Sequence, residues 1–291
     1  LKAELEKQLK EKRDKLTKSS CRTYASLLSN LPAKLKDENV SINWFTTNKT
    51  KILEYIKNNE KNRGQTQKTL LSALYILTGL EDYKTQMIIL CKSVNNNYKL
   101  QKLNDKQKEN TITFEQVKQK VVQLQKLLKE NPTFDNYINF LLVALMSGVY
   151  TPPRRNEYGM VKIKNYDKEK DNYYTKNTFI FNNFKTKKYK GSQALLIPKE
   201  LKNTMNKWLK LNPTDYMFYN TTTNQPLSSS SVSKRLTSIF GASITCDRLR
   251  SIYLSDFYKK DPNLLEKEKV SNLMGNSVIA QELFYVKLDK K

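Results

Sequence analysis

Near its C-terminus the chain reads Leu273-Met274-Gly275-Asn276-Ser277-Val278-Ile279-Ala280-Gln281-Glu282-Leu283-Phe284-Tyr285. A tyrosine therefore follows a glycine at a distance of ten residues. Thirty-five residues before that tyrosine lies Asp247-Arg248-Leu249-Arg250, and much further upstream lies Arg154-Arg155-Asn156-Glu157. A basic segment that starts at Lys185 lies between the two arginine motifs. None of these motifs is distinctive alone, so their order and spacing carry the information.

The charge of the chain is its strongest bulk property. Lys and Arg number 52 and Asp and Glu number 28, so the formal net charge is +24. A field of this sign attracts polyanions. The alternative explanation is a lysine-rich proteome of AT-biased composition. Against it, the number of acidic residues has not increased together with the number of lysines. The charge therefore favours a nucleic-acid partner.

The composition excludes several kinds of site. The chain has no histidine, which excludes Ser–His–Asp and Cys–His catalysis and histidine-ligated zinc. No glycine-rich phosphate-binding loop is present, which disfavours nucleotide hydrolysis. Cys21, Cys91 and Cys246 include no CxxC pair, which favours reduced thiols in an intracellular protein. No apolar stretch reaches membrane-spanning length and the charged start is no signal peptide. A start at Leu1 fits an excised fragment.

The chain is long enough for two domains. Residues 1–108 are predicted to be all-helical and to end in a lysine-rich linker over Asn95–Asn110. We expect an amphipathic helix at the start and a second helix capped by Ser19 and Ser20. The remaining helices of this part are predicted over Lys51–Asn58, Thr66–Leu77 and Tyr83–Val94.

Residues 109–291 form the second predicted domain, which mixes helices with a small antiparallel sheet. Thr113 caps a helix through Leu128, and Thr151 is expected to cap a helix whose first turn holds two prolines and presents Arg154 to an anion. The overall class is mostly α. Strands are predicted over Met160–Tyr166, Thr178–Phe184 and Ala194–Ile197. Further helices are predicted over Asn136–Met146, Lys199–Leu209, Ser230–Ile239, Cys246–Tyr258, Leu264–Met274 and Ser277–Tyr285.

Cleavage of a phosphodiester without a metal makes demands that these motifs meet. Negative charge on the non-bridging oxygens requires fixed cations, and arginine binds two oxygens at once without losing its proton. The leaving 5′ oxygen needs a proton, which a lysine can give. A covalent nucleophile conserves the bond energy, so religation needs no ATP.

These motifs resemble those of the tyrosine recombinases, or phage-type integrases. Thr151–Glu157 is similar to the first-arginine box, in which a Glu follows the Arg by three residues. This spacing favours Arg154 over its competitor Arg155. Asp247–Arg250 resembles the second-arginine box, Met274–Ser277 resembles the Gly-His box, and Tyr285 stands at the nucleophile's distance. The resemblance covers residues 111–285, and the helical region before them is similar only in character to a core-binding domain.

The resemblance implies a role for each residue. Arg154 and Arg250 would clamp the scissile phosphate and Tyr285 would form a 3′-phosphotyrosine. Lys185, whose rivals include Lys187, Lys188 and Lys190, would protonate the leaving oxygen. Glu157 would buttress an arginine or the local helix.

Two positions depart from the family pattern. Asp247 and Asn276 stand where the family has histidines. Asp247 is unfavourable beside a phosphate unless it pairs with Arg248 or Arg250, orients an arginine, or accepts the Tyr285 proton. Asn276 can still donate a hydrogen bond to phosphate. These departures leave open whether the activity is weakened or lost.

The expected partner is double-stranded DNA, gripped by two basic domains, with self-association from dimer to tetramer. No cofactor and no membrane contact are expected. Further candidate DNA contacts are Arg22, Lys49, Lys51, Lys61, Arg63, Lys68, Lys187, Lys188 and Arg248.

The predicted function is site-specific DNA recombination or integration by a mobile element or a large DNA virus. The enzyme would act in a host nucleus or viral factory, or otherwise in the cytoplasm. The alternatives are a type IB topoisomerase-like enzyme, a catalytically silent DNA-binding protein of the same fold, and a metal-dependent nuclease. Asp167, Glu169 and Asp171 look more like a polar turn than the carboxylate set of such a nuclease.

Overall fold

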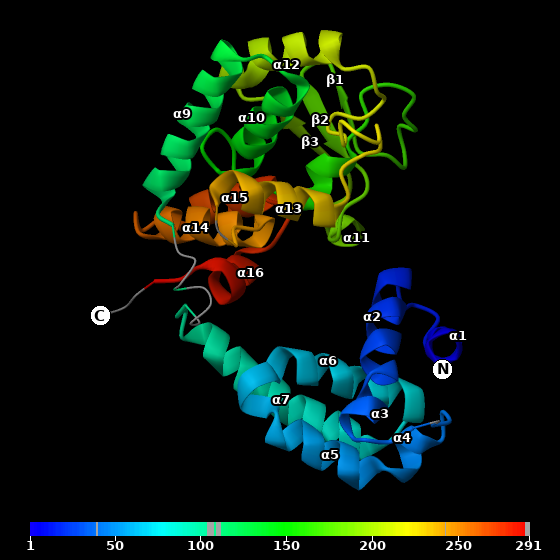
Figure 1. Cartoon of the computed structure of the whole chain (residues 1–291). Coiled ribbons are helices and arrows are strands. Elements are labelled where there is room, and N and C mark those ends of the chain that lie inside the picture. The colour runs from blue at the N-terminus through cyan, green and yellow to red at the C-terminus, as the bar shows by residue number, and fades with distance from the viewer. Residues whose placement is uncertain (39, 104–107, 109–111, 242, 289–291) are drawn as a thin grey trace. The chain divides into compact units, whose positions relative to one another are not determined.

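The computed structural model describes residues 1–38, 40–103, 108, 112–241 and 243–288, except for the side chains of residues 60–63. The chain forms two compact units, Leu1–Leu100 and Gln101–Lys291 (Figure 1). It is mostly helical and contains a three-stranded antiparallel sheet, which confirms the predicted fold class. None of the helices within these described ranges has the length and apolar content that crossing a membrane requires.

The first unit contains helices only, and a continuous apolar core joins them. Leu5, Leu28, Phe45 and Leu74 from four different helices are fully or almost fully buried in that core. The hydroxyl of Tyr83 donates to the carbonyl of Phe45 at 2.8 Å and so satisfies a buried polar group. The helices are α1 (Lys2–Lys12), α2 (Lys18–Ser29), α3 (Leu31–Lys34), α4 (Trp44–Thr47), α5 (Lys49–Asn58), α6 (Glu60–Thr78) and α7 (Glu81–Lys99).

Two local predictions in this unit are wrong. Helix α2 is capped by Thr17, whose side chain accepts from the backbone N–H of Ser20, so the predicted caps Ser19 and Ser20 lie inside the helix. Helix α7 continues to Lys99, through the first five residues of the predicted linker. The polar Asn95–Lys99 segment extends a helix whose apolar residues lie further upstream. The later part of the predicted linker, 104–107 and 109–110, lies outside the described residues.

The second unit is built around helix α10 (Phe134–Met146), whose residues from Tyr137 to Met146 are almost all buried. Helix α9 (Phe114–Glu130) packs its apolar face on α10 and starts with the predicted cap, Thr113, within a full capping box. Trp208 of α12 (Lys199–Leu211) stacks on Tyr137 of α10. Figure 1 shows α9 and α12 around α10. The remaining helices are α13 (Ser229–Phe240), α14 (Cys246–Tyr258), α15 (Leu264–Leu273), α16 (Val278–Ala280) and the π-helical turn η2 (Gln281–Tyr285).

The sheet has the order β1-β2-β3, with β1 (Tyr173–Thr175), β2 (Thr178–Phe181) and β3 (Gln193–Leu196). Two of the three predicted strands overlap β2 and β3. The predicted strand Met160–Tyr166 is wrong, because only Lys162 forms bridges there, to Tyr173 and Tyr216. The third strand is β1 instead. It turns into β2 through Lys176 and Asn177, which both have positive φ, as a tight hairpin turn requires.

Candidate active site

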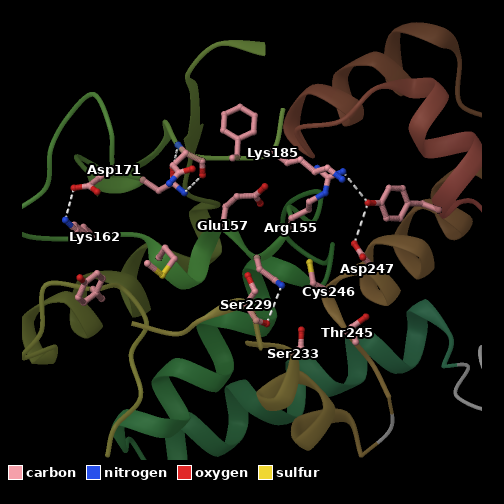
Figure 2. A pocket seen from close by; sticks show the side chains of 17 residues that line it. Arg155, Glu157, Lys162, Asp171, Lys185, Ser229, Ser233, Thr245, Cys246 and Asp247 are labelled. Atoms are coloured by element: carbon pink, nitrogen blue, oxygen red, sulfur yellow. Dashed lines mark hydrogen bonds and ion pairs between the residues drawn. The ribbon is translucent and has the colours of Figure 1, made fainter. Parts of the chain in front are cut away.

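Tyr285 lines a pocket of about 750 Å³ in the second unit. Residues from the 3₁₀ turn η1 (Asn156–Met160), the β2–β3 connection and the N-terminal ends of α13 and α14 line it as well. Figure 2 shows Arg155, Lys185 and Asp247 at one end of the pocket and the ion pair of Lys162 with Asp171 at the other. The structure thus brings four residues predicted for one site into one cavity: Glu157, Lys185, Asp247 and Tyr285.

Tyr285 is held at its backbone and at its ring. Its backbone carbonyl accepts from the hydroxyl of Ser251 at 2.5 Å, and the guanidinium of Arg250 lies 4.6 Å from the ring centroid. The residue is 9% exposed, and its hydroxyl reaches the pocket. Tyr285 ends a π-helical turn, a rare local structure that is frequent at functional sites. A buried ring with an accessible hydroxyl suits a positioned nucleophile.

Arg250 is fully buried and joins three segments of the site. Its Nη1 donates to the carbonyls of Pro153 and Met274, at 3.0 and 3.3 Å. The side-chain oxygen of Asn276 accepts from Arg250 Nη2 at 3.1 Å. Asn276 is 2% exposed and does not line the pocket of Tyr285. In this structure Asn276 supports Arg250, and its hydrogen bond to a phosphate stays a prediction.

Asp247 lies in the first turn of α14, after the N-cap Thr245. The hydroxyl of Tyr285 donates to its Oδ1 at 3.5 Å. Within the described residues no ion pair joins Asp247 to Arg248 or Arg250, which is one of the arrangements considered for this carboxylate. Of the interpretations of Asp247, acceptance of the tyrosine proton is the one that this geometry favours.

The two consecutive arginines lie on opposite sides of an extended segment. Arg154 is 1% exposed, lies 4.1 and 5.1 Å from the ring centroids of Phe181 and Phe184, and donates to the carbonyl of Leu273 at 2.9 Å. Burial lowers the pKa of Arg154 from its ordinary value. It lines a different, smaller cavity beside β3.

Arg155 is the arginine of this pair that faces Tyr285. Its Nη2 lies 3.5 Å from the tyrosine hydroxyl (Figure 2). The expected helix start at Arg154 is wrong, because the helical turn begins only at Asn156 and Arg155 is its N-cap. The spacing to Glu157 led to the prediction that Arg154, and not Arg155, contacts the phosphate. Successive side chains of an extended segment, however, point to opposite sides. That alternation puts the two arginines on opposite sides but does not show which of them faces the pocket.

The lysine segment reaches the pocket from the β2–β3 connection, where Lys187–Lys190 form the short helix α11. Lys185 is exposed and lines the pocket. Its neighbour Thr186 donates to the carbonyl of Gly275 at 2.7 Å, and Arg155 Nη1 donates to the same carbonyl at 3.4 Å. The rivals point elsewhere: Lys187 donates to the carbonyl of Glu169, Lys188 lies over Tyr189, and Lys190 donates to Asn272.

Two other groups line the pocket without contacting the Tyr285 hydroxyl. Glu157 is nearly buried, and its Oε2 lies 4.0 Å from Arg154 Nε, which fits the expected buttressing role. The thiol of Cys246 donates to the carbonyl of Arg154 at 3.1 Å. Burial raises the pKa of Cys246 to about 12, so the thiol stays protonated near neutral pH and is a poor nucleophile.

Substitution of Gly275 is expected to disturb this site through Arg154. Gly275 has φ +64°, and a Cβ there would lie 2.9 Å from Arg154 Nη2. Gly275→Ala should lower the free energy of unfolding by more than the roughly 1–2 kcal/mol that a left-handed alanine costs. Gly241→Ala is the matched control, because Gly241 has φ +67° and open space around its Cα. If urea unfolding gave the same loss of unfolding free energy for both variants, the Arg154 side chain would move away from the new Cβ at no measurable cost.

The predicted DNA contacts outside the pocket lie on both units. Lys49 and Lys51 form exposed ion pairs with Asp82 and Asp37, at 3.0 and 2.7 Å. Such pairs are weak and can yield to phosphate. Arg22 is exposed, Lys68 is half-buried and Arg248 is 8% exposed. Lys61 and Arg63 lie in α6, but their side chains are outside the described residues.

The acidic segment Asp167–Asp171 is the predicted polar turn. The side chain of Asp167 accepts from the backbone N–H groups of Glu169 and Lys170, and Asp171 pairs with Lys162 at 2.8 Å. Within the described ranges, no group of three or more His, Cys, Asp or Glu side chains is arranged to hold a metal ion.

Comparisons with known proteins identify the fold. No protein-family model matches the sequence, and a search of curated proteins gives no match. Among solved structures, the chain is similar to a lambda integrase (75–356) dimer bound to a COC′ core site. The TM-score is 0.59 at 15% identity, over 100% of this chain and 97% of that chain. XerA recombinase matches with a TM-score of 0.44 at 12% identity, over 100% and 95%. The integrase match shows that the chain has the tyrosine recombinase fold.

Proposed function

We propose that this chain is a site-specific DNA recombinase or integrase that cleaves and rejoins DNA strands through a 3′-phosphotyrosine at Tyr285. The observation that carries the proposal is the position of the Tyr285 hydroxyl. It reaches a pocket that also contains Arg155, Lys185 and Asp247, and its ring lies against Arg250. The shared fold and the order of the sequence motifs agree with this chemistry.

The proposed reaction assigns a role to each of these groups. The phenol oxygen of Tyr285 attacks the phosphorus and the bond to the 5′ oxygen breaks. Lys185 gives a proton to that oxygen, and the arginines balance the charge on the non-bridging oxygens. Attack by a 5′ hydroxyl on the phosphotyrosine then reseals the strand. Neither a metal nor ATP enters these steps.

Covalent trapping tests the proposal directly. Nicked suicide duplexes, ideally carrying the ends of the chain's own element, would be incubated with the protein in EDTA. An SDS-resistant adduct that requires Tyr285 supports the proposal. A requirement for a defined inverted-repeat site would then favour a recombinase over a topoisomerase-like enzyme.

Duplex DNA is the proposed partner, and its binding is expected to depend steeply on salt. The net charge of +24 and the lysines on both units support this proposal, because they offer many cations for contacts with phosphates. A protein with six to ten such contacts loses about 10³–10⁵-fold in affinity between about 50 and 200 mM salt. Titration of a labelled duplex at several salt concentrations measures this slope. A flat slope would contradict a mainly electrostatic interface.

Self-association on DNA is part of the proposal. The similar lambda integrase structure is a dimer bound to a core site, and we propose a dimer or tetramer on DNA for this chain. The abundance of Lys and Asn favours a mobile element or a large DNA virus as the source of the gene.

A catalytically silent DNA-binding protein is the second candidate. The observation that favours it is the pair of departures from the family pattern, with a carboxylate at position 247 and a buried amide at position 276. Tight binding to cognate DNA without any adduct would support this candidate.

A further inference from the structure

The hydroxyl of Tyr285 lies between two groups of opposite charge. Arg155 Nη2 and Asp247 Oδ1 are each 3.5 Å from it, and Figure 2 draws both contacts. The two groups come from distant parts of the chain, the segment before η1 and the first turn of α14. Neither forms an ion pair with another residue in the described ranges. Both charges are therefore available to the hydroxyl.

We infer that Asp247 and Arg155 act as a pair on Tyr285, with Asp247 as the proton acceptor and Arg155 as the cation that stabilises the oxygen as it loses its proton. This inference rests on the proposed function. A hydrogen bond of 3.5 Å is long, but catalytic contacts often shorten only when substrate binds. The chain has no histidine to supply either function.

The step balances without any further reactant. The O–H bond of Tyr285 breaks and its proton moves to Oδ1 of Asp247, while the phenol oxygen bonds to phosphorus. The bond from phosphorus to the 5′ oxygen breaks, and that oxygen takes its proton from Lys185. During religation the 5′ hydroxyl gives its proton back to Lys185 as its oxygen bonds to phosphorus, and Asp247 returns its proton to the departing phenol oxygen. Arg155 stays charged throughout, as its guanidinium does not deprotonate.

Other groups around the hydroxyl are less suited to accept its proton. The Cys246 thiol is already a donor to the Arg154 carbonyl. Glu157 lines the pocket, but its carboxylate lies against Arg154. A structural role is the competing explanation for Asp247, because a carboxylate in the first turn of a helix stabilises that helix. The experiment must separate that role from proton transfer.

A fluorinated tyrosine at position 285 makes this separation. Fluorine lowers the pKa of a phenol, so a base contributes less to the reaction. In single-turnover cleavage of suicide DNA, Asp247→Asn should slow the natural tyrosine by about 10²-fold or more. The same substitution should slow the fluorinated enzyme much less. Asp247→His should keep more activity than Asp247→Asn, since imidazole also accepts a proton. Asp256→Asn is the control in the same helix, outside the pocket.

Arg155 is tested in combination with Asp247. Arg155→Gln alone should slow cleavage by about 10²–10³-fold, as does loss of one electrostatic stabiliser. If the two residues act as a pair, the double variant Arg155→Gln/Asp247→Asn should lose less than the product of the single losses. Loss equal to the product would overturn the pairing.

The remaining outcomes separate this inference from the proposed function. An adduct with wild type but equally fast cleavage by Asp247→Asn would overturn the role of Asp247 alone. An equal loss for the natural and fluorinated tyrosines would show a structural role and overturn it too. Absence of an adduct even with wild type and cognate DNA would overturn the proposed function together with the pair.

Discussion

Replacing Tyr285 by phenylalanine is expected to abolish the covalent DNA adduct, a loss on the order of 10⁴-fold or more in cleavage rate. The variant removes the oxygen that we propose bonds to phosphorus. It keeps the ring against Arg250 and the backbone carbonyl that accepts from Ser251. Folding and DNA affinity should therefore stay as in wild type. Adduct formation on suicide DNA, thermal unfolding and duplex titration measure the three properties.

Tyr189→Phe is the matched control for this experiment. Tyr189 is 83% exposed on α11 and lies outside the pocket of Tyr285. This variant should form the adduct at the wild-type rate if the two tyrosines differ as proposed. An adduct that persists in Tyr285→Phe would place the nucleophile elsewhere and contradict the proposed function.

Lys185→Ala should produce the second-largest effect. Without a proton for the leaving 5′ oxygen, cleavage is expected to slow by about 10²–10⁴-fold. Lys185 is exposed, so the variant should fold normally. A substrate with sulfur in place of the bridging 5′ oxygen provides the decisive measurement, because a thiolate leaves without being protonated. This substrate should restore most of the lost rate.

Lys188→Ala serves as the control for Lys185. Lys188 is also exposed in the same connection, but it lies over Tyr189 and outside the pocket. The Lys188→Ala variant should at most lower the affinity for DNA. That effect should be the same for the natural substrate and for the substrate with a bridging sulfur. If sulfur fails to rescue Lys185→Ala, Lys185 holds the phosphate rather than protonating the leaving group.

The sequence predicted the helical framework well, because apolar periodicity and caps are local signals. The second unit shows this clearly, since Thr113 caps α9 and α14 has the predicted bounds. The sheet was harder to predict. Strand β1 is three residues long and turns through Lys176 and Asn177, which lack the usual glycine. Its register depends on contacts with β2 rather than on its own pattern.

Spacing along the chain selected Tyr285, Lys185 and Asp247 as candidate site residues, and the structure places all three around one pocket. The choice between Arg154 and Arg155 depended on which side of an extended segment faces the pocket. That orientation follows from long-range contacts, because Leu273 and Gln193 hold the Arg154 guanidinium from elements far away in the chain. No pattern near position 154 carries this information.

The backbone carbonyl of Gly275 connects two of the segments that line the pocket. Thr186, next to Lys185, and Arg155 both donate to it, from segments that are otherwise independent. The β2–β3 connection, the segment before η1 and the glycine turn ten residues before Tyr285 therefore meet at one carbonyl. A displacement of the Gly275 carbonyl would disturb both hydrogen bonds at once, because the two donors share this acceptor. We therefore expect a movement of the Gly275 turn to displace Thr186 and Arg155 together.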